Sequence, residues 1–253
     1  MKYFTLIAAL VLLASGTVRA DWNSVITADS PLHWFNFEDA GATADDLGSA
    51  DADGTYAGGV TLGSAGLVGG AASFDGTGHV LVGGADLTGD WTVETIFKAD
   101  TVNGGASMGI MGADFTAASR MALKAEQWNS TERLGFTVFG VVDVTTEVPT
   151  PSDYSHVAFV GTSAGVSVFV DGVESGSSDV ATALSRYVLG AGAIRADGSL
   201  VDGLTGSIDE LVIYDRALSA GDIAAHYAAV PEPSSVVLIG LGTLGLLAIR
   251  RRR

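Results

Sequence analysis

The stretch Gly206–Ser219, which reads GSIDELVIYDRALS, decides the fold of this chain. Its apolar residues belong to the run Leu204–Tyr214, which predicts two strands. Directly after it, Ser219 is suited to cap a helix, and Asp222 stands in for the Glu of a capping box. This order predicts one short helix, over residues 220–228, at the end of a strand-rich domain.

Upstream of this stretch, short runs of alternating apolar and polar residues predict many more strands. In the run Trp91–Phe97, odd-numbered residues fall on one face of a strand and even-numbered residues on the other. Asp171-Gly172 between two such runs is a strong hairpin signal. The sequence therefore predicts an all-β sandwich of two antiparallel sheets, with one or both sheets half exposed. The expected strands are 32–37, 71–74, 80–82, 91–97, 108–111, 120–125, 134–139, 141–145, 154–161, 166–170 and 173–175.

The N-terminus has the pattern of a secretory signal peptide. Lys2 supplies a positive charge, Phe4–Leu13 is apolar, and Val18-Arg19-Ala20 is a small-x-small cleavage site. We expect residues 1–20 to be removed before Asp21.

The C-terminus is a second processing segment, residues 230–253. Pro231-Glu232-Pro233 is held extended by its prolines, and the uncharged run Val236–Ile249 can enter a bilayer as a transmembrane helix. At ~1.5 Å per residue this run is short for a ~30 Å hydrocarbon core. The terminal arginines 250–253 are expected to stay on the cytoplasmic side.

This C-terminal segment resembles the PEP-CTERM sorting signal of Gram-negative bacteria, with Pro231, Glu232 and Pro233 as the sorting motif. The resemblance implies export by the secretion machinery and anchoring in the inner membrane through the C-terminal helix. It also implies recognition and cleavage by an exosortase, followed by delivery to the cell surface or extracellular matrix. An ordinary C-terminal membrane anchor is the alternative.

The remaining residues form one acidic domain, expected over 21–229. Between the two end segments there are seven Lys and Arg against 28 Asp and Glu, a net charge of −21. Such a domain repels nucleic acid and anionic lipid. The chain has no cysteine, so no disulfide stabilises it.

Several segments, in order from Leu32 to Tyr227, carry a family resemblance. The domain resembles the concanavalin A-like, laminin G-like (LamG) family, which implies a jelly-roll β-sandwich. The sequence departs from the family pattern at Tyr154-Ser155, where Trp is usual, and at Asp39, where Glu is common. The matching segments are Leu32–Asp39 with Asp46 and Asp53–Tyr56, Ala71–Gly76, Asp90–Glu94, His156–Ala158, Val168–Gly172 and Gly206–Ser219.

A catalytic site is not indicated. Glycosidases need two carboxylates at a defined separation, usually on one strand face. Asp209 and Glu210 are adjacent on a strand and therefore point to opposite faces. If the chain were a polysaccharide hydrolase or lyase, Glu94, Glu126 and Asp209 would be the residues to mutate. We expect no enzyme activity.

One structural calcium ion is implied by the family resemblance, between the early Asp-rich loop and the Ile-Asp-Glu strand. The candidate ligands at the matching positions are Asp39, Asp46, Asp75 and Asp209, and hard cations prefer such oxygen donors. Alternatively, Asp209 is hydrogen-bonded to a loop and the others cap turns.

A carbohydrate site is predicted around Gln127, Trp128 and Asn129, because sugar sites combine an aromatic platform with planar polar groups. Arg120 and Arg133 lie nearby in sequence. Trp128 is alternatively a core residue.

The leading hypothesis is an exported, non-enzymatic module that binds polysaccharide or a matrix protein. A structural matrix or coat protein without a specific ligand is the second hypothesis, and a polysaccharide-degrading enzyme is the third.

Overall fold

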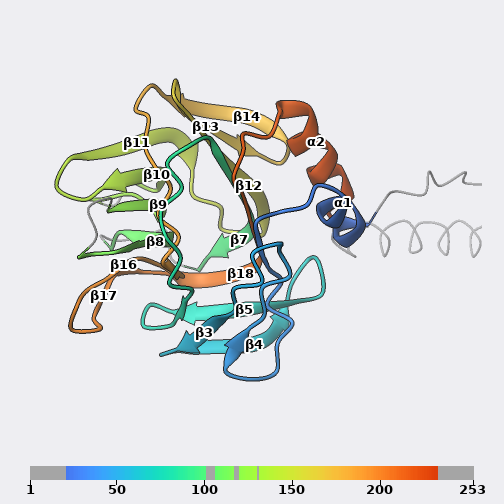
Figure 1. Cartoon of the computed structure of the whole chain (residues 1–253), viewed down its shortest axis with the longest axis horizontal. Helices are drawn as coiled ribbons and strands as arrows, with labels where there is room; N and C mark the ends of the chain where they lie inside the picture. The colour runs from blue at the N-terminus through green and yellow to red at the C-terminus, as the bar shows by residue number, and fades with distance from the viewer. Residues whose placement is uncertain (1–20, 101–105, 117–119, 130, 233–253) are drawn as a thin grey trace, which may run out of the picture.

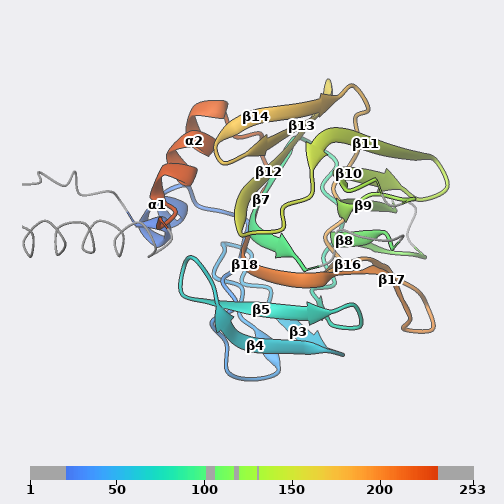
Figure 2. The ribbon, with the colours of Figure 1, turned by 180° about the vertical axis from the view of Figure 1, so that it is seen from behind.

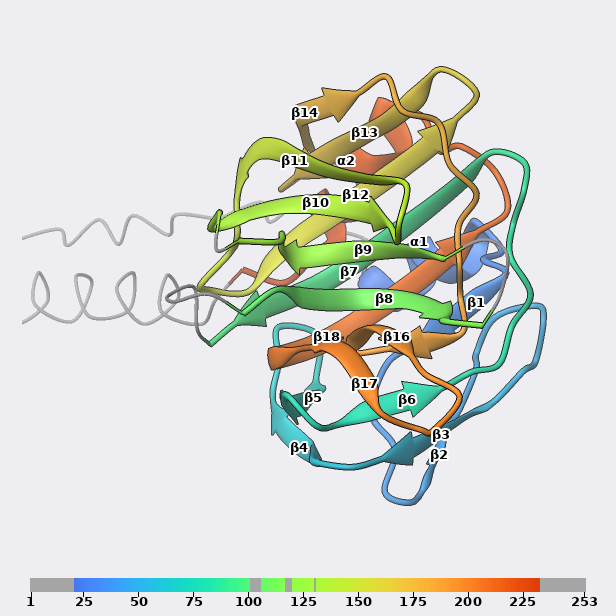
Figure 3. The same ribbon diagram turned by 90° about the vertical axis from the view of Figure 1, so that its left-hand side faces the viewer.

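The computed structural model describes residues 21–100, 106–116, 120–129 and 131–232. Two antiparallel sheets pack face to face (Figures 1 and 3), as the sequence predicts. Within the described residues, the first sheet runs in the order β14 (Val173–Ser178), β13 (Gly165–Val170), β12 (Ser155–Thr162), β7 (Trp91–Ala99), β18 (Thr205–Tyr214), β5 (Gly70–Asp75) and β4 (Val60–Ala65), with β1 (His33–Phe35) beside β18.

The second sheet is built from shorter strands and a folded-back hairpin (Figure 3). The hairpin β16–β17 joins it because β16 pairs parallel with β8. The order is β11 (Val142–Pro149), β10 (Arg133–Val138), β9 (Met121–Glu126), β8 (Met108–Asp114), β15 (Val188–Leu189), β6 (His79–Leu81), β3 (Gly54–Ala57) and β2 (Thr43–Ala44), with β16 (Ala191–Ile194) and β17 (Leu200–Gly203) off this path.

The main core lies between the sheets. Trp91 and Phe97 from β7 face Leu123 and Phe136 of the second sheet within one cluster of buried side chains. The alternation predicted for β7 is therefore confirmed on its inner face.

A second core lies on the outer face of the first sheet, under two helices. Helix α1 (Trp22–Ala28) and helix α2 (Ala220–Ala229) lie side by side there (Figures 1 and 2). Trp22 and Ile223 from the helices pack with Ile96 and Val212 from the sheet. The central strands β7 and β18 are therefore buried on both faces, and the expectation of a half-exposed sheet is wrong for them.

The two helices differ in how well the sequence predicts them. Helix α2 has the predicted capping box between Ser219 and Asp222. Helix α1 was not predicted; it has only seven residues, with Asp21 as its N-cap. In the described part of the chain, no helix is long and apolar enough to cross a membrane. The predicted signal peptide, residues 1–20, and the predicted membrane segment, residues 236–249, lie outside the described residues.

The run Leu204–Tyr214, predicted as two strands, contains a single strand, β18. Its pairing with β7 shifts from Ile208 opposite Phe97 to Glu210 opposite Ile96, which leaves Asp209 as the extra residue of a bulge. The bulge interrupts the alternation of inward and outward side chains without ending the strand. For this reason the sequence pattern predicts two strands where the structure has one.

Candidate functional site

A pocket of about 340 Å³ lies on the outer face of the second sheet. On β9, Met121, Leu123 and Ala125 point into the core, so Lys124 between them points outward. We call this hollow the outer pocket; its lining residues are Ser107, Lys124, Trp128, Thr137, Phe139, Gly140, Asp143, Arg195, Val201 and Asp202.

Lys124 lies at the floor of the outer pocket, where it is only 1% exposed. Its ammonium group pairs with the carboxylate of Asp202 and donates a hydrogen bond to Ser107 Oγ at 2.7 Å. Burial lowers the pKa of Lys124, and Asp202 opposes that shift. Asp202 has a backbone φ of 54°, a left-handed conformation that aspartate adopts more readily than most residues. The hairpin β16–β17 thus places the carboxylate of Asp202 against the buried ammonium group of Lys124.

A hydrogen-bond network supports one wall of the outer pocket. Thr137 Oγ1 lies 2.8 Å from Asp143 Oδ1 and 3.1 Å from Gln127 Oε1. The amide nitrogen of Gln127 donates to the carbonyls of Phe136 and Val144. Gln127 is buried, so this predicted binding residue holds the wall in place from behind.

Trp128 and Asn129 lie at the rim. Trp128 is 66% exposed and lines the outer pocket, so it is not a core residue. Asn129 is exposed and has a φ of 71°, a turn conformation that asparagine tolerates. The structure therefore places Trp128 at the rim of a polar pocket. The pocket also contains Lys124, Asp143, Arg195 and Asp202, four residues that the sequence does not predict for this site.

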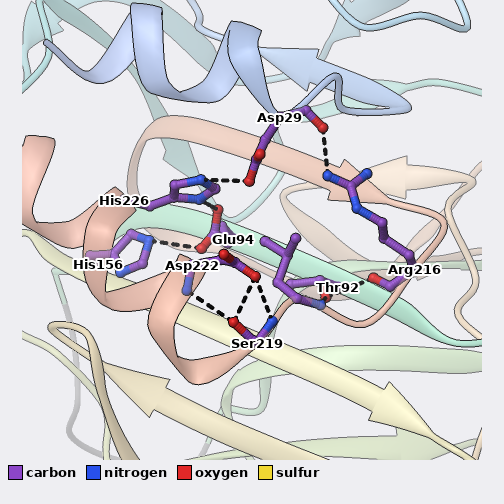
Figure 4. A network of polar contacts seen from close by, with 9 residues as sticks. Asp29, Thr92, Glu94, His156, Arg216, Ser219, Asp222 and His226 are labelled. Atoms are coloured by element: carbon purple, nitrogen blue, oxygen red, sulfur yellow. Dashed lines mark hydrogen bonds and ion pairs between the residues drawn. The ribbon is translucent and has the colours of Figure 1, made fainter. Parts of the chain in front are cut away.

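A second polar cluster lies between the helices and the first sheet (Figure 4). Glu94 of β7 is fully buried, with Oε2 2.7 Å from His226 Nδ1 and Oε1 3.5 Å from His156 Nε2. His226 Nε2 lies 3.0 Å from Asp29 Oδ2, at the end of α1. Burial alone would raise the pKa of Glu94, but the two imidazoles hold it below its ordinary value. This cluster fastens α1 and α2 to the sheet.

The other acidic residues considered for catalysis are also enclosed. Glu126 is 2% exposed and accepts a hydrogen bond from the Glu132 amide at 2.5 Å, and burial raises its pKa. Asp209 accepts from the amides of Leu67 and Val68 at 2.6 and 2.9 Å. Burial raises the pKa of Asp209 to about 6 despite these two donors.

The four candidate calcium ligands do not form one cluster. No group of three or more His, Asp or Glu side chains in the described residues is arranged to hold a metal. Asp46 is buried and accepts from His33 Nδ1 at 2.7 Å and from three backbone amides, Asp39 accepts from the Tyr56 hydroxyl at 2.6 Å, and Asp75 caps its own turn. These hydrogen bonds do not fit a shared ion site, and calcium binding stays a prediction.

The start of the sorting motif follows α2 directly. Pro231 and Glu232 are exposed and border a hollow of about 310 Å³ beside Tyr154, His156 and Tyr227. Pro233 lies outside the described residues.

Two family models match the chain. One, Laminin_G_3, described as the concanavalin A-like lectin/glucanases superfamily, matches residues 74–224, more than half of the chain. The chain belongs to this superfamily. The other, the PEP-CTERM protein-sorting motif, matches residues 229–253. No curated protein matches this concanavalin A-like chain.

Solved structures share the concanavalin A-like fold at low identity. A Trypanosoma rangeli sialidase mutant with trans-sialidase activity matches with a TM-score of 0.60 and 14% identity, over 82% of this chain and 35% of the sialidase. Domain 4 of AbnA, an extracellular arabinanase from Geobacillus stearothermophilus in complex with arabinotriose, matches with a TM-score of 0.59 and 20% identity, over 78% of this chain and 98% of that domain. The concanavalin A-like chain spans about a third of the length of the sialidases, so these matches show the fold alone.

Proposed function

We propose that this is an exported cell-surface protein whose concanavalin A-like domain binds polysaccharide in the outer pocket without cleaving it. One observation carries the proposal: the exposed indole of Trp128 stands beside a pocket with buried polar groups on its floor. Sugar rings stack on aromatic faces, and their hydroxyls need fixed donors and acceptors.

The pocket supplies those polar groups in an ordered arrangement. Lys124 donates, Asp143 and Asp202 accept, and Gln127 and Thr137 hold the wall that carries Asp143. A pre-organised site loses less entropy on binding than a flexible one. The complex of the similar arabinanase domain with arabinotriose supports a sugar ligand for this fold.

Binding without catalysis is supported by the surroundings of the acidic residues. Glu94, Glu126 and Asp209 are each buried and hydrogen-bonded to the protein, whereas a glycosidase needs a pair of carboxylates on either side of an accessible bond. Sugar release by the purified protein that is lost in Glu94→Gln, Glu126→Gln or Asp209→Asn would contradict this part of the proposal.

The sorting motif supports an exported protein that is associated with the cell envelope or surface. We infer that an exosortase cleaves it near Pro231-Glu232-Pro233 after membrane anchoring, and that the domain then attaches to polysaccharide or protein of the surrounding matrix. Intact mass and localisation of the protein from its producing cells test this inference. A protein that keeps residues 236–253 at the cell surface would contradict cleavage.

The binding test uses the exported protein on a panel of immobilised polysaccharides, with arabinan included. Trp128→Ala is expected to lower retention roughly tenfold or more, because truncation of a tryptophan that anchors a ligand typically costs about 2 kcal/mol. Val173→Ala on β14 is the matched control, since Val173 is also 66% exposed but lies on the other sheet. Absence of retention on every polysaccharide, or equal loss in both variants, would contradict the proposal.

A further inference from the structure

Two arginines stand apart from the other basic residues of the domain. In residues 21–230, five of the seven basic side chains have a polar partner: Lys98 with Asp100, Lys124 with Asp202, Arg133 with Glu147, Arg186 with His33, and Arg216 with the carbonyl of Asp29. Within the described residues, Arg120 and Arg195 make neither an ion pair nor a side-chain hydrogen bond. Asp197, close to Arg195 in sequence, accepts hydrogen bonds from Ser199 that lower its pKa, and the charge of Arg195 adds a smaller effect in the same direction without an ion pair.

Both unpaired guanidinium groups meet at one aromatic ring. The Cζ atoms of Arg120 and Arg195 lie 5.5 and 5.4 Å from the centre of the Phe115 ring. Phe115 in turn lies 5.3 Å from Phe139, which lines the outer pocket together with Arg195. Arg195 therefore lines the outer pocket, and Arg120 lies next to it, since its carbonyl also accepts a hydrogen bond from the Phe139 amide at 2.9 Å.

The topology explains this meeting of distant residues. The parallel pairing of β16 with β8 continues past both strands, where the Phe115 amide donates to the Ile194 carbonyl at 2.8 Å. Phe115 and Arg195 thus leave the two strands side by side. The antiparallel pairing of β8 with β9 brings Arg120, just before β9, to the same end of the sheet.

Such a pair of cations is unusual in a domain with a net charge of −21. Arginine stacked on an aromatic face keeps its N–H groups free, and its planar fork matches a carboxylate in a two-bond contact. The carboxylates beside the pocket are already engaged, Asp202 by Lys124 and Asp143 by Thr137.

We propose that the ligand of the outer pocket is an acidic polysaccharide of the uronic-acid class. Arg120 and Arg195 bind the sugar carboxylate, and Trp128 stacks on a ring of the same chain. This proposal rests on the proposed function and names the class of sugar that the pocket selects.

The experiment compares polygalacturonate with its fully methyl-esterified form, which has the same backbone without the charge. The exported protein is expected to bind polygalacturonate more tightly, and added salt is expected to weaken that binding. Arg120→Gln/Arg195→Gln should weaken it at least tenfold and weaken binding of the ester much less, because the ester keeps a carbonyl acceptor but has no charge. Arg133→Gln is the control, because that arginine lies on the same sheet but pairs with Glu147. If the double variant unfolds, Arg195→Gln alone replaces it, since Arg195 is exposed.

The outcomes separate the two proposals. Preference for the ester, or unchanged binding of polygalacturonate by the arginine variants, overturns the acidic-sugar proposal and leaves sugar binding standing. Failure to bind any polysaccharide overturns both. Both proposals are supported if Trp128→Ala weakens binding of both polymers and the arginine variants weaken binding of the acid form far more than that of the ester.

Discussion

At the scale of single residues, the adjacent carboxyl groups of Asp209 and Glu210 make the stability of the domain depend on pH. Glu210 is 1% exposed and accepts a hydrogen bond from Trp34 Nε1 at 2.6 Å. Burial raises the pKa of Glu210 from its ordinary 4.5 to about 8, although the Trp34 hydrogen bond opposes the shift. The folded protein therefore holds a proton there that the unfolded chain releases at neutral pH.

Glu210→Gln is expected to flatten the pH dependence of stability. With a folded pKa above the unfolded one, the contribution of Glu210 is complete below its ordinary pKa of 4.5 and is lost as the pH rises through about 8. The free energy of unfolding of the native protein should fall between these limits by up to about 1.4 kcal/mol per pH unit. Glutamine keeps an acceptor for Trp34 without the charge, so the variant should be the more stable protein at pH 9.

Denaturant unfolding at pH 5, 7 and 9 measures this difference. Glu174→Gln on β14 is the control, because Glu174 is exposed. A native protein whose stability rises from pH 5 to 9, or a variant with the same pH profile, would contradict the assignment. The raised pKa of Asp209, about 6, should add a smaller decrease in the free energy of unfolding as the pH rises towards that value.

Gly161→Ala is expected to destabilise the main core. An added Cβ at Gly161 would lie 2.1 Å from Cε2 of the Trp91 ring, which is fully buried and cannot move aside freely. Overpacking of this kind costs about 1–3 kcal/mol. Thermal unfolding measures the change, and Gly89→Ala is the control because nothing lies within 4 Å of an added Cβ there. Equal melting temperatures of the two variants would refute the role given to Gly161.

At the scale of elements, a buried polar cluster joins the first helix of the domain to the last. His226 of α2 contacts Glu94 of β7 at 2.7 Å and Asp29, directly after α1, at 3.0 Å (Figure 4). Trp22 of α1 packs edge-on against the rings of both His156 and His226. Helix α1, with only seven residues, is too short to be stable by itself and depends on these contacts.

His226→Leu should loosen both helices together. Leucine fills similar space but leaves Glu94 without its closest hydrogen bond, and breaking a buried ion pair costs about 3–5 kcal/mol. Hydrogen exchange of the α1 amides should accelerate, although the substitution lies in α2. Ala225→Leu on the exposed face of α2 is the control. Unchanged exchange in α1 would show that the helices are held independently.

At the scale of the whole molecule, the described chain begins and ends at the same place. Asp21 caps α1 and Val230 caps α2, and the two helices lie side by side on the outer face of the first sheet (Figure 1). Ala229 and Val230 are each 7% exposed, whereas Pro231 and Glu232 are exposed. Among the described residues, Val230 is therefore the last buried one, directly before the sorting motif.

Removal of the tag should leave the fold intact only if the cut falls after Val230. A chain of residues 21–232 is expected to have the same melting temperature as the processed natural protein. A chain that ends at Tyr227 lacks Ala229 and Val230 and should lose about 2 kcal/mol, because burial of a valine contributes about 1.5–3 kcal/mol. Thermal unfolding of the two chains makes the comparison. Equal melting temperatures would contradict this boundary.

The candidate site was predictable in part. The combination of aromatic and amide residues in one loop predicts a sugar site at Trp128, with the core as the alternative, and the structure places this side chain at a pocket rim. Asp202 and Lys124 are 78 residues apart, and the meeting of Arg195 with Phe115 depends on a parallel pairing that no local pattern encodes. The same limit applies to Glu94, whose partners His156 and His226 lie 62 and 132 residues further along the chain, in β12 and α2.

The sequence by itself determined the strand-rich sandwich, the capped helix α2 and the sorting motif, because alternation, capping and short motifs are local properties of neighbouring residues. Only the tertiary structure decided which charged groups lose their water and which acquire partners. Those outcomes depend on how β16, β17 and the two helices fold back over the sheets, and burial and distance then set the chemistry of each side chain.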